Sequence, residues 1–134
     1  MKLCRFGNNK LGLVEGDEVL DVSEALATLP ALHYPMPLGD LLIRHLPEVS
    51  AAAQSLAAGA ARYPLAQVKL LSPVANPSKI IAAPINYQSH IDLDLVDSEI
   101  AHKHTISHIS HAGLFLKATS SLVGPGEGFE IQFP

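Results

Sequence analysis

Residues 2–6 alternate between polar and apolar positions, and two further short runs rich in apolar residues follow over residues 11–15 and 18–22. Alternation with a period of two is typical of strands that bury one face. Gly7-Asn8-Asn9-Lys10 and Gly16-Asp17 separate the runs, and Gly and Asn tolerate the positive φ of tight turns. The sequence therefore begins with a predicted antiparallel meander.

Helical patterns follow the meander. Ser23 is a candidate N-cap for a short helix over residues 24–29, and a loop rich in proline separates it from a second helix over residues 38–46. His45 lies on the apolar side of the second helix, so we expect it to be half-buried rather than catalytic.

A third helix is predicted from Pro47, which suits a first helical turn, to about Arg62. Its alanines give it high helix propensity. Leu56 is almost its only large apolar side chain, so we expect this helix to pack at the margin of its domain.

A further strand is predicted over residues 65–71, and two prolines with an asparagine make residues 72–78 a stiff linker. We therefore predict an N-terminal α+β domain over residues 1–72, a linker over 73–78, and the start of a second domain over 79–134.

Residues 80–90 are the stretch around which the chain is organised. A short apolar run over residues 80–83 predicts a buried strand, which Pro84 ends because it has no N–H to donate. Asn86, Tyr87 and His90 follow at the mouth of this strand. Two interpretations fit: catalytic groups mounted on a loop, or a helix capped by Asn86 with His90 on its surface.

Acidic residues and then histidines crowd the interval after this motif. Three of the histidines share a face if the segment is helical, and such spacing can hold a transition metal. The alternative is a solvated polar segment. The residues are Asp92, Asp94, Asp97, Glu99, His102, His104, His108 and His111.

The last part of the chain predicts a strand over residues 114–117, a turn over 124–128 and a final strand over 129–133. The glycines of this turn match neither the spacing of a phosphate-binding loop nor that of a dinucleotide-binding loop.

Composition narrows the class of protein. The chain has 134 residues, 48% of them hydrophobic and 5% aromatic, so it can form an aliphatic core of one ordinary domain or two small ones. A formal net charge of −4 argues against general nucleic-acid binding. The single cysteine, Cys4, excludes an internal disulfide, and no apolar run is long enough to span a membrane. We expect a cytoplasmic location.

Two blocks of the sequence resemble one enzyme family. Asn86-Tyr87-Gln88-Ser89-His90 after a strand resembles the Asn-Tyr-x-x-His motif of the fumarylacetoacetate hydrolase family. Phe115-Leu116-Lys117, followed by residues 120–126, is similar to the next block of that family. The resemblance implies that residues 79–134 begin a mixed β-roll catalytic domain, left incomplete, in an enzyme that commonly dimerises.

The resemblance also implies a chemistry. It implies metal-dependent cleavage of a C–C bond beside a ketone in a small keto acid or acylpyruvate, by a hydrolase, decarboxylase or isomerase, with Mg²⁺, Mn²⁺ or Ca²⁺. The motif puts the general base at His90. Substrate-binding roles then fall to Asn86, Tyr87 and Lys117. Some relatives have a Glu three residues after the His, where this chain has Leu93, so Asp92 and Asp94 are the candidate orienting carboxylates.

The serious departure from the family comes near the end of the sequence. Relatives continue into a strand with a Glu-x-Glu pair that binds the metal, and Glu127 and Glu130 come too early to replace it. We therefore expect no metal ligands in this chain, and no activity from the chain alone. The rival hypothesis is a non-catalytic binding or assembly module. A reading frame that continues into a Glu-x-Glu strand would favour the enzyme.

Overall fold

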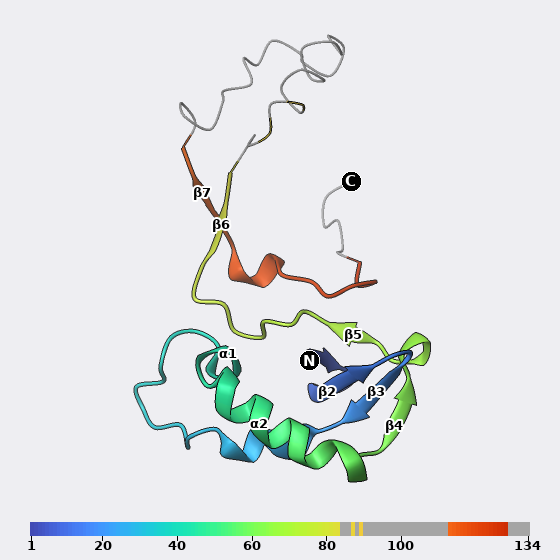
Figure 1. The fold of residues 1–134 in the computed structure, drawn as a ribbon. Coiled ribbons are helices and arrows are strands. Elements are labelled where there is room, and N and C mark those ends of the chain that lie inside the picture. Colours follow the sequence, from blue (N-terminus) through green and yellow to red (C-terminus); the bar gives the residue numbers. More distant parts are fainter. Residues whose placement is uncertain (84–86, 88, 90–112, 129–134) are drawn as a thin grey trace. The chain divides into compact units, whose positions relative to one another are not determined.

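The computed structural model describes residues 1–83, 87, 89 and 113–128. Two compact parts are present: unit 1 comprises Met1–Ser78 with Ser121–Pro134, and unit 2 comprises Lys79–Ser120. The described residues form a five-stranded sheet in the order β4-β3-β2-β1-β5 and a two-stranded sheet of β6 and β7 (Figure 1). The chain is thus α+β with antiparallel sheets. The division into domains 1–72 and 79–134 stays a prediction.

The predicted meander is confirmed. Strands β1 (Lys2–Phe6), β2 (Lys10–Glu15) and β3 (Glu18–Asp21) pair antiparallel. Leu3 lies opposite Leu13, and Leu13 lies opposite Leu20, so apolar side chains line one face of the sheet. The turns between the strands have positive φ, at Gly7, Asn9 and Gly16.

The two outer strands are short. Strand β4 (Arg62–Pro64) pairs with β3, and β5 (Leu70–Leu71) pairs with the end of β1. The prediction of a single strand over residues 65–71 is wrong in part, because a 3₁₀ turn, η3 (Leu65–Gln67), comes first.

The helical elements lie between β3 and β4. They are the 3₁₀ helix η1 (Ser23–Thr28), α1 (Leu41–Arg44), α2 (Leu46–Leu56) and the 3₁₀ turn η2 (Ala57–Gly59). Pro47 lies in the first turn of α2, as predicted, and His45 is half-buried. No helix among the described residues is long and apolar enough to cross a membrane.

The predicted helix over residues 47–62 ends too late. Helix α2 stops at Leu56, and Arg62 belongs to β4. The Arg62 guanidinium lies 2.8 Å from Glu18 Oε2 and 3.4 Å from Glu15 Oε2, across the turn between β2 and β3. Strand pairing and these ion pairs outweigh the helix propensity of the alanines.

Helix α2 covers the centre of the sheet, so the expectation of a marginal helix is wrong (Figure 1). Val49 and Ala53 are fully buried against the apolar face of the meander. The small side chain of Ala53 lets the helix approach the sheet closely, which an inventory of large apolar residues does not reveal. The core consists of Leu11, Leu13, Leu20, Val22, Ala25, Val49 and Ala53.

Ser23 is not the N-cap of η1; Val22 occupies that position, with no side-chain cap. The Ser23 hydroxyl instead accepts a hydrogen bond from the Leu11 N–H at 3.1 Å and donates one to Asp21 Oδ1 at 2.5 Å. These two bonds join the end of the meander to the start of η1.

The opposite face of the meander carries a second, smaller apolar cluster. Phe6 and Val19 are buried there, and the Phe6 and Tyr63 rings lie 6.0 Å apart between centroids. The Lys10 ammonium lies 5.5 Å from the Tyr63 centroid and 2.7 Å from Asp21 Oδ2. Gly12 lies beneath this cluster, where an added Cβ would collide with Val19 and would come within 2.8 Å of Cys4 Sγ.

We expect Gly12→Ala to lower the free energy of unfolding by about 1–3 kcal/mol, because the added methyl overpacks the cluster. Val19 cannot give way easily, since β-branched side chains are stiff at χ1. Urea unfolding followed by circular dichroism measures the change. Gly59→Ala is the matched control, because its Cβ would meet nothing within 4 Å. Equal stability of the two variants would contradict the packing argument.

Candidate functional site

The two sequence blocks that resemble the hydrolase family lie on paired strands. Strand β6 (Ile80–Ala82) leads into the Asn86–His90 motif, and β7 (Phe115–Lys117) carries the second block. They pair antiparallel, with Ala82 opposite Phe115 and Ile80 opposite Lys117. Residues 33 to 37 positions apart in sequence therefore lie side by side, and both predicted strands are confirmed.

Two of the predicted site residues are described. Tyr87 is 71% exposed, and Lys117 is exposed with its ammonium 5.9 Å from the centroid of the Phe115 ring. Because Lys117 pairs with Ile80, its backbone lies at the start of β6 rather than at the end that leads to the motif. The other predicted site residues lie outside the described residues: Asn86, His90, Asp92, Asp94, His102, His104, His108 and His111.

The expected burial of the motif strand is wrong. Ile81 is exposed, as is Leu116 opposite it, and Ile80 and Ala82 are only half-buried. The strand forms as predicted, but the described residues leave the Ile81 side chain largely exposed.

The linker before β6 is fixed to unit 1 by Asp40. Asp40 caps α1: its Oδ1 accepts hydrogen bonds from the Leu42 N–H at 3.0 Å and the Ile43 N–H at 3.3 Å. Its Oδ2 accepts bonds from the Ala75 N–H at 2.6 Å and the Asn76 N–H at 3.1 Å. Burial by itself would raise the pKa of Asp40, but these backbone donors hold it below its usual value.

The start of the linker is fixed as well. The Arg5 guanidinium donates to the carbonyl oxygen of Ser72 at 2.7 Å, and the Ser72 hydroxyl donates to the Val74 carbonyl at 3.0 Å. Ser72 is itself buried. These hydrogen bonds, together with the two prolines, therefore restrict the conformation of the linker.

The glycine turn of the second block belongs to unit 1 and packs on β5. Gly124 lies so close to β5 that an added Cβ would come within 2.7 Å of the Leu71 Cα and the Ser72 nitrogen. Glu127 accepts a hydrogen bond from the Gly124 N–H at 2.6 Å and lies 3.0 Å from the Lys69 ammonium. These two donors lower the pKa of Glu127. The turn predicted over residues 124–128 is confirmed by the Glu127 N–H, which donates to the Gly124 carbonyl at 3.1 Å.

The described residues do not fit a metal centre. Over residues 1–83, 87, 89 and 113–128, no group of three or more His, Cys, Asp or Glu side chains could hold an ion. Glu127 is already engaged with Lys69 and Gly124. A divalent cation needs several oxygen ligands, and the described carboxylates do not converge.

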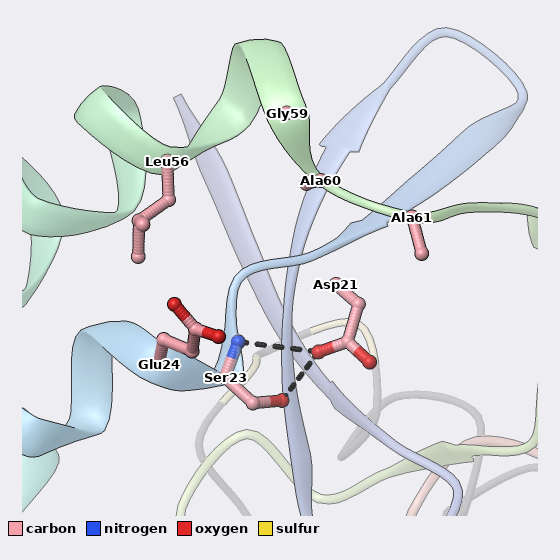
Figure 2. Close-up of a pocket in the computed structure, with 7 residues that line it drawn as sticks. All are labelled: Asp21, Ser23, Glu24, Leu56, Gly59, Ala60 and Ala61. Atoms are coloured by element: carbon pink, nitrogen blue, oxygen red, sulfur yellow. Dashed lines mark hydrogen bonds between the residues drawn. The ribbon is translucent and has the colours of Figure 1, made fainter.

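A surface hollow of about 430 Å³ lies where η1 meets the end of α2. Figure 2 shows Asp21 and Ser23 joined by hydrogen bonds at its floor, with Leu56, Gly59 and Ala60 along one side. Asp21 is held by Lys10 and Ser23, so its carboxylate serves the fold. The residues that line this hollow do not form a cluster of catalytic side chains.

Asp40 is a structural position that sequence reasoning missed. An Asp immediately before a helical Leu-Leu-Ile run is a signal for an N-cap, and it could have identified the start of α1. The bonds from Asp40 to Ala75 and Asn76 have no local signal, because they join residues 35 and 36 positions apart.

Comparison with known proteins finds relatives that are all described as maleylpyruvate hydrolases. No family model matches the chain. The chain is 56% identical over 134 residues to a maleylpyruvate hydrolase of Aquipseudomonas alcaligenes, a match that covers 98% of this chain and 47% of the relative. The chain thus spans about half the length of the curated relative it matches.

Two solved structures are similar as well. A maleylpyruvate hydrolase from Sphingobium sp. SYK-6 superposes with a TM-score of 0.61 and 38% identity, over 93% of this chain and 39% of that chain. A structure of the Sphingobium sp. SYK-6 maleylpyruvate hydrolase in complex with manganese(II) and pyruvate gives a TM-score of 0.52 and 40% identity, over 67% of this chain and 34% of that chain.

We expect Asp40→Asn to lower the free energy of unfolding by about 1–3 kcal/mol. An amide oxygen can satisfy one pair of backbone N–H groups, but the amide nitrogen then faces the other pair. Chemical denaturation measures the loss, with Asp17→Asn as a control that removes the same charge from an exposed turn. A loss of equal size in the control would assign the effect to net charge.

The stabilisation by Asp40 should depend on pH. Because the folded-state pKa is lowered from 3.8, the contribution is fully present above pH 3.8 and disappears as the pH falls through the folded-state pKa. The stability difference between the native chain and Asp40→Asn should therefore be constant near neutral pH and shrink below pH 3.8. A difference that grows in acid would contradict this sign.

We expect Gly124→Ala to push the glycine turn away from β5, since its Cβ would meet backbone atoms that cannot rotate aside. Hydrogen exchange of the Glu127 amide should become at least about tenfold faster. Gly128→Ala, whose Cβ would meet nothing within 4 Å, should leave this rate unchanged. An unchanged rate in Gly124→Ala would show that the turn does not depend on the close approach.

Proposed function

We propose that this chain belongs to the fumarylacetoacetate hydrolase family and forms part of a metal-dependent hydrolase that cleaves acylpyruvates such as maleylpyruvate. The observation that carries the proposal is the 56% identity over 134 residues to a maleylpyruvate hydrolase. The pairing of β6 with β7 supports it, because it joins the two sequence blocks that resemble the family. A cytoplasmic location and a homo-oligomeric state are part of the proposal.

In this proposal His90 acts as the general base. An imidazole can take a proton from water near neutral pH without a large shift of its pKa. The hydroxide that this produces adds to the ketone carbonyl, and the tetrahedral adduct collapses as the C–C bond beside it breaks. The electron pair of that bond leaves with the enolate of the keto acid product, which takes up the proton held by His90. Asp92 or Asp94 orients His90, while Asn86, Tyr87 and Lys117 bind the keto acid.

The proposed enzyme uses a divalent cation, and a solved relative holds manganese(II) together with pyruvate. Since the described residues of this chain do not converge on a cation, we assign no metal ligand among them. The same consideration leads us to propose that the 134-residue chain alone does not turn over acylpyruvates.

The second candidate function is a non-catalytic binding or assembly module. The observation that favours it is that the meander, η1 and α2 build a hydrophobic core of their own in the N-terminal part of the chain. The two candidates predict different behaviour when the rest of a hydrolase is supplied, because only the enzyme hypothesis predicts that residues of this chain perform chemistry.

A chimera tests the proposal. This chain replaces the matched part of the Aquipseudomonas alcaligenes hydrolase, and acylpyruvate cleavage is followed by ultraviolet absorbance with saturating Mn²⁺. We expect the chimera to hydrolyse maleylpyruvate and His90→Ala to lower kcat by roughly 10²–10⁴-fold. The chain alone, assayed beside it, should be inactive.

His33→Ala in the chimera is the matched control, because His33 lies in an exposed loop of unit 1. It should keep full activity. A chimera that is folded by circular dichroism but cleaves no acylpyruvate would favour the binding module, and a His90→Ala chimera with normal kcat would refute the role of His90.

A further inference from the structure

A second surface hollow lies beside strand β1, helix α1 and the start of α2. It has a volume of about 250 Å³, and all its lining residues belong to unit 1. Apolar side chains make up most of its wall. We name this hollow the β1–α1 groove, and its wall includes Leu3, Arg5, Leu42, Ile43, Leu46 and Pro73.

The groove is continuous with the hydrophobic core. Leu11 lines it and is a buried member of the core cluster, and Leu3 and Leu42 pack against that cluster. Ile43 and Leu46 line it as well but are 46% and 38% exposed. The packing of unit 1 thus forms the groove without a ligand, and a ligand that covers Ile43 and Leu46 removes apolar surface from water.

The groove carries charge of one sign. Among the described residues that line it there is no Asp or Glu, and Arg5 is the one charged side chain. The chain as a whole has a formal net charge of −4, so a positive group on a wall without carboxylates is a local departure from the rest of the sequence. Such a wall is complementary to an anion that has an apolar part.

Arg5 has hydrogen-bond donors left for such an anion. Its guanidinium donates to the Ser72 carbonyl oxygen at 2.7 Å and to Asn9 Oδ1 at 2.5 Å, and both acceptors are neutral. A guanidinium has five N–H donors, and Arg5 forms no ion pair within the described part of the chain. Arg5 is also half-buried, so a charge-assisted hydrogen bond to it is screened less by water than one at an exposed Arg.

The carboxylates around the groove have other partners. Asp40 accepts four backbone hydrogen bonds, two from α1 and two from the linker. The Gly124 N–H and the Lys69 ammonium lower the pKa of Glu127, and Arg5 adds only a smaller electrostatic contribution. Neither carboxylate forms a hydrogen bond with Arg5, so neither takes the place of an external anion.

We propose that the β1–α1 groove binds a small carboxylate with an apolar tail. The carboxylate accepts hydrogen bonds from Arg5, and the tail lies along Leu42, Ile43 and Leu46. The groove holds about eight groups of the size of a water molecule, at about 30 Å³ each. Hexanoate, with roughly that number of non-hydrogen atoms, is therefore the probe of matching size. The proposal goes beyond the hydrolase activity and does not depend on it.

Titration of the 134-residue chain tests the proposal. Binding of hexanoate is followed by ¹H–¹⁵N NMR, through the amide shifts of Leu3, Ile43 and Ser50, which all line the groove. Acetate has the carboxylate without the tail, and hexan-1-ol has the tail without the charge. We expect hexanoate to bind at least about tenfold more tightly than either, because only hexanoate satisfies both the Arg5 guanidinium and the apolar wall.

Two variants assign the binding to the groove. Ile43→Glu places a negative charge on the wall, and should weaken hexanoate binding at least about tenfold. Glu suits this position, because it is a good helix former near the start of α1. Arg5→Gln should weaken hexanoate binding and leave the weak binding of hexan-1-ol unchanged. Leu38→Glu, at a loop position that is 82% exposed, is the matched control and should bind hexanoate normally.

Each result decides the proposal. Amide shifts confined to the groove, with the expected order of the three probes and weaker binding by Ile43→Glu, support it. Hexan-1-ol that binds as tightly as hexanoate would show an apolar groove that does not select anions, and acetate that binds as tightly would show that the tail is not bound. Either result would overturn the proposal, as would unchanged groove amides, normal binding by Ile43→Glu, or a groove covered by a second copy of the chain in a dimer detected by light scattering.

Discussion

A single carboxylate determines how the chain passes from its helical region to the motif-bearing strand. Asp40 accepts four backbone hydrogen bonds, two that begin α1 and two that hold the linker at Ala75 and Asn76. Hydrogen bonds to an ionised carboxylate are stronger than those between neutral groups, so both segments depend on the same side chain. Within unit 1, Asp40 thus keeps the linker in place beside the start of α1 up to Asn76.

The meander is packed on both faces, and the two faces are packed by different means. Helix α2 covers one face with Val49 and Ala53, and the core there is aliphatic. The other face relies on Phe6 and Val19 closing over Gly12, with Tyr63 and the stem of Lys10 at the rim. A sheet this short can bury both sides only because one strand position has no side chain. The fold of unit 1 therefore does not require the exposed strands of unit 2 for its own core.

The sequence is informative where structure follows from neighbouring residues. The meander could be predicted because its alternation and its Gly and Asn turns are local, and β6 and β7 could be predicted from their apolar runs. The predicted C-terminal end of helix α2 was too late, because Arg62 pairs with β3, whose residues lie more than 40 positions away in the sequence. Ser23 was taken for a cap because its true partner, the Leu11 N–H, belongs to another strand. The candidate site was identified by resemblance, and of its residues only Tyr87 and Lys117 lie within the described part of the chain.

The contact between Phe6 and Tyr63 gives the chain a built-in optical reporter. The sequence contains three tyrosines and no tryptophan, so its ultraviolet fluorescence comes from tyrosine alone. Tyr34 is 95% exposed and Tyr87 is 71% exposed, and both therefore have nearly the same surroundings in the folded and the unfolded chain. Tyr63 packs against Phe6 and the Lys10 ammonium, so unfolding changes its environment most. The emission of this protein consequently reports on the pairing of β4 with β3, and hence on the edge of the sheet where the chain leaves its helices.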